Sequence, residues 1–218
     1  MHTLARRLLY FAFLGAHGAV FAGAQVYEPL AASVQAAMSK AVSDYAPRTS
    51  AFKFKLDEVE WLSAMSQRLD LRVRDHNSRI ALLKSVHYEA SRAGLDPQLV
   101  LGLIQVESGF RKYAVSTAGA RGLMQVMPFW VTLIGAQGDN LFDLRKNIRY
   151  GCTILRHYLD LEKGDLYRAL GRYNGSLGKP EYPRAVEAAW KNQWRYGGKL
   201  AATARRRAPR DFSLRATV

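Results

Sequence analysis

The sequence predicts a mainly α-helical domain, and three observations support this prediction. Apolar residues recur at spacings of three and four along most of the chain, as they do on one face of an amphipathic helix. Helix-starting aspartates and helix-ending glycines flank these segments. No segment alternates convincingly as a strand, except residues 110–120, which suit a short β-hairpin. We therefore expect helices with at most one short hairpin.

The first 24 residues have the layout of a secretory signal peptide. Arg6 and Arg7 precede an apolar stretch over residues 8–21, and an A-x-A sequence ends at Ala24. Cleavage after Ala24 is favoured over an uncleaved membrane anchor, because glycines and a histidine interrupt the apolar stretch. We expect a periplasmic or secreted protein without a stable membrane span after signal cleavage.

Residues 25–76 are expected to form an N-terminal lead-in that packs on the main domain. Its first part is small and polar and suits a helix over residues 30–43. A capping box, Asp57-x-x-Glu60, predicts the start of a second helix. The apolar face predicted for this second helix consists of Val59, Leu62, Met65 and Leu69.

The main domain is expected to span residues 77–198 and to begin with two helices. The first starts at Asn77 or Ser78 and ends at Gly94, with His87 as a packing residue beside its apolar face. The second starts with Asp96 as N-cap and Pro97 in its first turn. Because the segment "PQLVLGLIQVE" is apolar nearly all round, we expect this second helix to be buried.

Four more helices are predicted in the main domain, after an irregular turn between Gly119 and Gly122. In order, they are a helix over residues 123–135, a long helix capped by Asp143 with Gly151 and Cys152 suited to close packing, a helix restarting at Gly164–Asp165, and a final helix after Pro183.

The tail over residues 199–218 loses the apolar period and holds six basic residues against one acidic residue. We expect it to be disordered. The net charge of the whole chain is +14, which favours a polyanionic partner: nucleic acid, an anionic lipid surface or an anionic cell-wall polymer. Export argues against nucleic acid. With one cysteine and five scattered histidines, the chain predicts no disulfide, no metal and no cofactor.

Glu107 is the only acidic residue between Leu103 and Gly138. It follows an apolar run, and burial there would raise its pKa, as a general acid requires. Glycoside cleavage commonly uses such an acid, but standard glycosidases need a second carboxylate about 5 to 10 Å away. Either a later acid folds back, or the substrate supplies its own nucleophile. The plainer alternative is that Glu107 ends a helix and pairs with Arg111 or Arg121.

Four segments in order resemble the soluble lytic murein transglycosylases, of the SLT type. They are Glu107-Ser108-Gly109-Phe110, the run from Ala118 to Pro128 containing "GLMQVMP", Asn147-Ile148-Arg149-x-Gly151, and Tyr173-Asn174-Gly175. The resemblance covers roughly residues 77 to 195 and implies a lysozyme-like helical fold. It also implies non-hydrolytic cleavage of the β-1,4 bond between N-acetylmuramic acid and N-acetylglucosamine, with formation of a 1,6-anhydro ring.

The same resemblance implies that Glu107 is the sole catalytic acid and base. The substrate-contacting positions that it implies are Ser116, Gln125 and Met127, and Tyr173 matches the tyrosine beside the acid. Ser108, Asn174 and Tyr182 are carried over as further site residues. The residues themselves fit these roles: Gln125 offers a donor and an acceptor, and Met127 an apolar wall for a sugar face. The alternative for Met127 and Tyr173 is a place in the core, and for Ser116 a place in a turn.

The sequence departs from the family pattern in loops that are expected to line the groove. Arg111-Lys112 replaces Asn-Pro, Thr117 replaces a proline, and the signature after Asn174 reads Gly-Ser-Leu-Gly. These changes bear on sugar preference. Rival functions are a hydrolysing lysozyme-like muramidase and a non-catalytic peptidoglycan-binding protein. We expect a monomer that acts on peptidoglycan glycan strands, with a cell-envelope secretion or pilus apparatus as a candidate partner.

Overall fold

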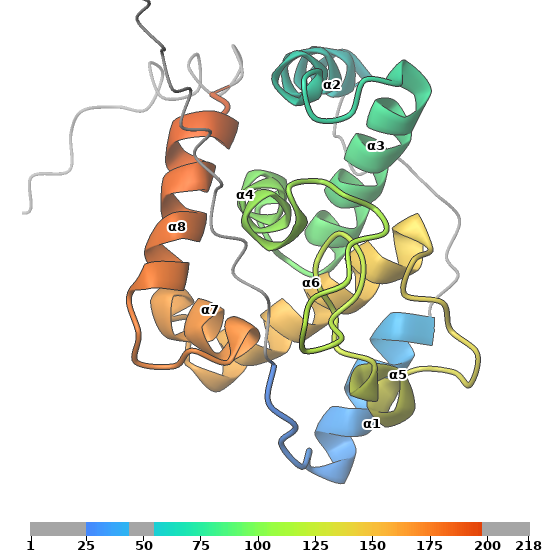
Figure 1. The fold of residues 1–218 in the computed structure, drawn as a ribbon, viewed down its shortest axis with the longest axis vertical. Helices are drawn as coiled ribbons and strands as arrows, with labels where there is room; N and C mark the ends of the chain where they lie inside the picture. The colour runs from blue at the N-terminus through green and yellow to red at the C-terminus, as the bar shows by residue number, and fades with distance from the viewer. Residues whose placement is uncertain (1–24, 44–54, 198–218) are drawn as a thin grey trace, which may run out of the picture.

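The computed structural model describes residues 25–43 and 55–197, so the predicted signal peptide and basic tail lie outside the described residues. Within these residues the prediction of a mainly helical domain is confirmed, and no strand is present (Figure 1). The elements are α1 (Ala32–Ser43), α2 (Lys55–Leu69), α3 (His76–Arg92), α4 (Pro97–Ser108), α5 (Phe129–Ile134), α6 (Leu144–Leu161), α7 (Leu166–Asn174), α8 (Glu181–Ala189) and the π-helix η1 (Trp190–Trp194).

Helix α4 lies at the centre of the domain, as its all-round apolar sequence predicts. Asp96 caps it by accepting a hydrogen bond from the N–H of Gln98, and Gly109 ends it in the left-handed conformation. The helix packs against α3, α8 and η1. The approach is close at Gly102, where an added Cβ would lie 2.9 Å from the main-chain nitrogen of Trp190.

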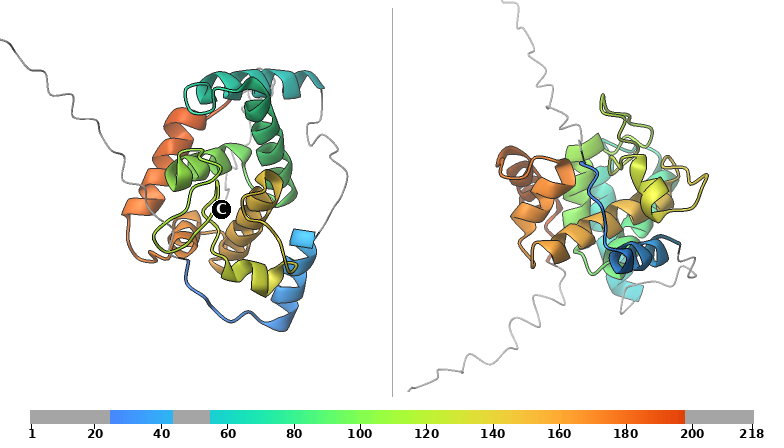
Figure 2. Two further views of the ribbon diagram at one scale, coloured as in Figure 1. Left: turned by 45° about the vertical axis from the view of Figure 1, so that its right-hand side comes forward. Right: turned by 90° about the horizontal axis from the view of Figure 1, so that it is seen from below.

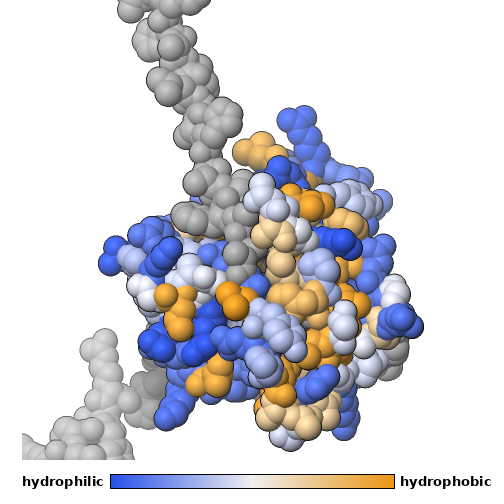
Figure 3. Space-filling view, turned by 60° about the horizontal axis from the view of Figure 1, so that its bottom comes forward, coloured by the Kyte–Doolittle hydropathy of each residue, from blue (hydrophilic) through white to orange (hydrophobic). Residues whose placement is uncertain are grey.

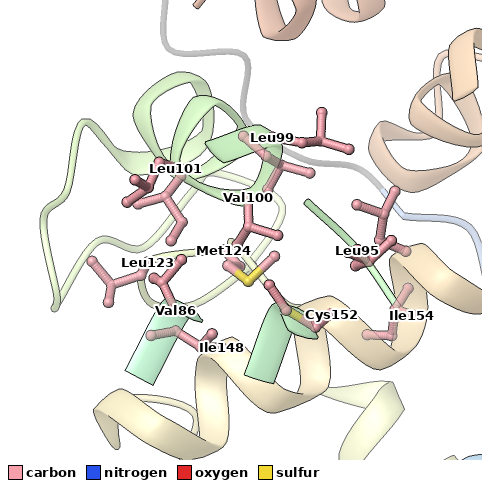
Figure 4. Packing of buried hydrophobic residues seen from close by; sticks show 14 of the residues in the cluster. Val86, Leu95, Leu99, Val100, Leu101, Leu123, Met124, Ile148, Cys152 and Ile154 are labelled. Carbon is pink, nitrogen blue, oxygen red and sulfur yellow. The ribbon is translucent and has the colours of Figure 1, made fainter. Parts of the chain in front are cut away.

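The layer beside α4 is formed by α6, which packs against α3, α7 and α1. Figure 4 shows the side chain of Met124 between the two layers, with Val100 of α4 on one side and Cys152 of α6 on the other. Gly151 makes this contact possible, because an added Cβ would lie 2.4 Å from the Met124 sulfur. The close packing expected at this glycine is therefore observed.

Three predicted helix starts are displaced, and the first is that of α2. Helix α2 begins at Lys55, so Asp57 lies in its first turn and is not the N-cap. Val59 is 63% exposed, and Trp61 is buried on this helix together with Leu62, where it packs edge-on against His87. The capping-box pattern was therefore misleading here, because the helix extends beyond it.

Pro183 was expected to precede the last helix, but α8 begins at Glu181. Proline is tolerated in a first turn because the N–H that it lacks would have no helical partner there. Helix α3 similarly begins at His76, since the side chain of Asp75 accepts a hydrogen bond from the N–H of Ser78.

The helix predicted over residues 123–135 is wrong in its first half. Only Phe129–Ile134 are helical, and residues 120–128 form a loop that we call the Gln125 loop. In place of a hairpin, isolated antiparallel bridges join Arg121 to Val115 and to Val126. Gln125 has a φ of +48°, which interrupts a helix.

The predicted helix over residues 30–43 is present as α1, and it packs against α5 and α6. Residues 25–31, which we call the strap, precede it without regular structure. Figure 2 shows the strap running across the domain from α1, on the side where α5 and α7 lie. The N-terminal lead-in thus begins as a segment laid over the main domain.

Candidate active site

Glu107 lies in the last turn of α4 and has no solvent exposure. The hydroxyl of Tyr182 donates a hydrogen bond to Oε1 at 2.5 Å, and Oε2 is buried with no hydrogen-bond partner. Burial raises the pKa of Glu107 to about 8, and the Tyr182 hydrogen bond offsets this rise only in part. Glu107 is therefore protonated at neutral pH, and one of its oxygens is not engaged in a hydrogen bond.

The nearby cations do not pair with this carboxylate. Arg111 donates to the main-chain oxygen of Ser108, at the end of α4. Lys112 and Arg121 are exposed, and no salt bridge to Glu107 is present among the described residues. The pairing that would have lowered the pKa and explained Glu107 as an ordinary helix end is thus not observed.

The later acids that could supply a second carboxylate, Asp139, Asp143, Asp160, Glu162 and Asp165, are engaged elsewhere. Asp143 and Asp165 cap helices, as their sequence context predicts. The remaining three have side-chain partners: Asp139 with Lys146 and Tyr150, Asp160 with Arg156, and Glu162 with Arg168 and Arg172. None of them contributes to the shifted pKa of Glu107.

Glu89 provides a contrast, because it is the other buried carboxylate of the described helical core. It accepts from Arg92, Arg145 and Arg149, and so its charge is compensated. The two glutamates thus differ: the charge of Glu89 is compensated by arginines, whereas Glu107 has no salt bridge among the described residues.

The Gln125 loop is held against α6 by one side chain. Oδ1 of Asn147 accepts from the N–H of Met124 at 2.8 Å, while Nδ2 donates to the carbonyls of Arg121 and Leu141 at 2.9 and 2.8 Å. Gly122 has a φ of +76°, and an added Cβ would lie 2.4 Å from Nδ2 of Asn147. Asn147 belongs to a motif of the sequence, but its role as the organiser of this loop was not predicted.

The predicted contact residues on and beside this loop make different contacts with it. The Gln125 side chain is buried and donates to the carbonyls of Gly122 and Ala114 at 2.8 and 3.2 Å. Ser116 accepts from the N–H of Ala120 in the turn. Met127 is partly buried and packs against the core. Gln125 and Ser116 therefore shape the loop, whereas Met127 lies at its edge.

The remaining predicted site residues lie in the last turns of α4 and α7 and in the first turn of α8. Tyr173 is buried, and its hydroxyl donates to the carbonyl of Met124 at 2.7 Å. The hydroxyl that donates to Glu107 is that of Tyr182 and not that of Tyr173. The hydroxyl of Ser108 contacts the carbonyls of Leu123 and Ile104 and not the carboxylate. Nδ2 of Asn174 is buried without a hydrogen-bond partner.

Gln25, the first residue of the strap, is a component of the site that the sequence did not reveal. Its side chain is buried against the Gln125 loop: Oε1 accepts from the N–H of Met127 at 3.2 Å and from Nε1 of Trp130 at 2.9 Å. Its Nε2 lies 3.4 Å from the carbonyl of Gln125, and the side chain also hydrogen-bonds with Tyr173. No local pattern marks this residue, because its partners are about 100 residues away.

Within the described ranges, no cluster of histidine, cysteine and carboxylate side chains could hold a metal ion. The same residues contain no helix with the length and apolar character needed to cross a membrane.

The family model "Transglycosylase SLT domain" matches residues 84–192, which is half of the chain. The chain belongs to this SLT transglycosylase family. The matched SLT region includes Glu107, the whole Gln125 loop, Asn147, Tyr173 and Tyr182. The resemblance seen in the sequence motifs is thereby confirmed, whereas the strap and α1 lie outside the matched SLT region.

Curated relatives of this SLT protein are known by name. The transglycosylase of Enterobacteria phage PRD1 is 37% identical over 93 residues, covering 43% of this chain and 34% of that protein. The membrane-bound lytic murein transglycosylase C of Histophilus somni is 42% identical over 91 residues, covering 36% and 25%. The chain thus spans about a third or less of the length of these relatives.

Among solved structures, an inactive mutant of the lytic transglycosylase Slt from Pseudomonas aeruginosa aligns with this SLT protein at a TM-score of 0.41 and 22% identity. The alignment covers 62% of this chain and 25% of that one.

Proposed function

We propose that this protein is an exported peptidoglycan lytic transglycosylase that cleaves the bond between N-acetylmuramic acid and N-acetylglucosamine. One observation carries the proposal: Glu107 is a fully buried carboxylate with one unpartnered oxygen and a pKa raised to about 8. It lies within an SLT domain, and no second carboxylate contributes to its pKa shift. A single group of this kind suits a reaction in which the substrate supplies the nucleophile.

In the first step Glu107 acts as a general acid. Its Oε2–H donates the proton to the glycosidic oxygen, and the bond between this oxygen and C1 of the muramyl residue breaks. The leaving N-acetylglucosamine thereby gains a free 4-hydroxyl. Tyr182 donates to Oε1 and so stabilises the carboxylate that remains on Glu107.

In the second step the same carboxylate acts as a base. It takes the proton from the C6 hydroxyl of the muramyl residue while the C6 oxygen bonds to C1, which closes the 1,6-anhydro ring. Glu107 regains its proton, and no water is consumed. The uncharged state required for the next cycle is the one that burial favours at neutral pH.

The relatives support the choice of substrate, because several are named lytic murein transglycosylases. A hydrolysing muramidase is the main alternative, and it would need a base that activates water. The acids considered above are engaged as caps or in side-chain contacts, which favours the non-hydrolytic reaction. A non-catalytic peptidoglycan-binding protein would not need a protonated buried glutamate.

Export through the leader over residues 1–24, with cleavage after Ala24, is part of the proposal. So is the division into a lead-in over residues 25–76, a catalytic domain over 77–198 and a basic tail over 199–218. The tail's charge suits attachment to an anionic wall or membrane surface. A secretion or pilus apparatus of the cell envelope is the partner that we propose would recruit the enzyme locally.

The assignment of Glu107 is tested by the variant Glu107→Gln, which keeps the acceptor for Tyr182 but has no proton to transfer. We expect lysis of purified sacculi to fall by about 10² to 10⁴-fold, the usual contribution of a general acid. The matched control is Glu181→Gln, which changes an exposed glutamate next to Tyr182. Unchanged lysis by a folded Glu107→Gln variant would rule out the proposed role.

A further inference from the structure

The side chain of Gln25 occupies a pocket whose polar lining is complementary to an amide. Two donors, the N–H of Met127 and Nε1–H of Trp130, converge on the Gln25 oxygen at 3.2 and 2.9 Å. The Gln125 carbonyl lies 3.4 Å from the Gln25 nitrogen. One side of the pocket therefore presents donors and the other an acceptor, as an amide oxygen and an amide N–H require.

An acetamido group of an amino sugar has the same pair of functions, a carbonyl oxygen and an N–H on one planar unit. It would differ from the glutamine carboxamide in carrying a methyl group, which suits the apolar side chains of Met127 and Trp130. The pocket is close to the proposed acid, because the Tyr173 hydroxyl hydrogen-bonds with Gln25 and donates to the Met124 carbonyl. The neighbouring carbonyl of Leu123 accepts at 2.7 Å from Ser108, the residue that follows Glu107. A sugar reaching Glu107 would thus place an acetamido group where Gln25 now lies.

The strap that carries Gln25 is held mainly by side chains. Among the described residues, no main-chain group of residues 25–30 bonds to another main-chain group. Tyr27, 58% exposed, touches Phe129 edge-on, and Glu28 pairs with Arg172 at 3.2 Å near the surface. Such exposed ion pairs contribute at most about 1 kcal/mol. The strap can therefore detach from the domain without disrupting a helix. Polar and apolar groups are interspersed on this side of the molecule (Figure 3).

Helix α1, by contrast, is firmly attached. Nε2 of Gln35 donates to the carbonyl of Leu133 at 2.8 Å, and Met38 and Val42 are buried in the core. The carbonyl of Ala41 also accepts from Arg92 at 2.6 Å. The anchored helix keeps the strap tethered near the pocket, so its local concentration is high even when it is displaced.

We propose that the strap is an autoinhibitory element, in which the carboxamide of Gln25 occupies an acetamido-binding pocket and must be displaced before substrate reaches Glu107. The complete burial of Glu107, including its unpartnered Oε2, fits a closed state of the site. This inference rests on the proposed function for the identity of the ligand, an N-acetylated glycan. Anything that draws the strap away, such as a wall-bound partner, would activate the enzyme.

Binding measurements test the inference independently of the reaction, in a Glu107→Gln background that cannot turn over. The probe is the β-1,4-linked trimer of N-acetylglucosamine, titrated by calorimetry into the full chain. If the strap fills the pocket in about 80–90% of molecules, Gln25→Ala should bind the trimer about five to tenfold more tightly. Glu28→Gln, which removes the ionic contact with Arg172, should give a smaller change in the same direction.

The matched control is Gln67→Ala, which removes an exposed glutamine of α2. This control should bind the acetylated trimer with the same affinity as the parent. The deacetylated glucosamine trimer should bind to Gln25→Ala no more tightly than to the parent. The proposal is overturned if Gln25→Ala binds the acetylated trimer no more tightly than the parent, if Gln67→Ala tightens binding equally, or if deacetylation makes no difference. A failure here would leave the lysis test of Glu107 unaffected.

Discussion

Burial of Glu107 makes the stability of the fold depend on pH, because the ionised form is poorly solvated in the core. Its folded-state pKa of about 8 lies above the ordinary value of 4.5. The stabilising contribution of the neutral acid is therefore fully present below about pH 4.5 and is lost as pH rises through about 8. The raised pKa thus keeps the acid protonated at neutral pH and makes the fold less stable in alkaline solution.

Glu107→Gln should remove this dependence, since the amide keeps the Tyr182 contact and cannot ionise. We expect the variant and the wild type to be similar in stability near pH 4.5. The variant should become the more stable of the two as pH rises, by at most about 5 kcal/mol at pH 9. Urea unfolding at several pH values measures this difference, and a difference that does not change with pH would contradict the raised pKa.

Tyr182→Phe should change the pH profile of lysis. Glu107 must be protonated to act as the acid, so wild-type activity should fall above about pH 8. The Tyr182 hydrogen bond lowers the pKa, and its loss should move this fall to higher pH and reduce the rate about tenfold or more. Tyr173→Phe is the control, because its hydroxyl bonds to the Met124 carbonyl and its removal should leave the fall near pH 8.

At the scale of elements, local signals located most helices. Asp96, Asp143 and Asp165 are N-caps as predicted, and Gly109 ends α4. The Gln125 loop was mistaken for a helix because its conformation depends on Asn147, some 23 residues further along the chain. The helix propensities of the residues in "LMQVMP" could not show that the distant side-chain amide of Asn147 would bind the main chain of this loop.

Asn147→Asp should test this dependence. The carboxylate keeps an acceptor for the Met124 N–H but loses both donors and faces the carbonyls of Arg121 and Leu141. We expect a loss of about 2–5 kcal/mol in the free energy of unfolding and a strong loss of lysis. Asn140→Asp is the matched control, because Oδ1 of this exposed residue accepts from the N–H of Phe142 and a carboxylate can do the same. The free energy of unfolding should therefore stay nearly unchanged. Equal effects of the two substitutions in urea unfolding would contradict the role of Asn147.

At the scale of the whole molecule, the SLT domain and the N-terminal lead-in are less separate than the sequence indicated. Composition indicated that residues 25–76 are an addition to the main domain, and the helix α1 within them was predicted. The position of the strap on the domain was not predictable, because the contacts of Gln25 with Met127 and Trp130 join segments about 100 residues apart. The Glu107 environment was predicted better, since it is built largely from motifs that the family shares.

The fate of water in the reaction tests the central claim most directly, namely that one glutamate cleaves the glycan while the substrate provides the nucleophile. Purified sacculi would be digested in water labelled with heavy oxygen, and the muramyl ends analysed by mass spectrometry. We expect 1,6-anhydro ends without label, formed by the wild type and absent with Glu107→Gln. New reducing muramyl ends formed in place of anhydro ends would show hydrolysis and contradict this mechanism.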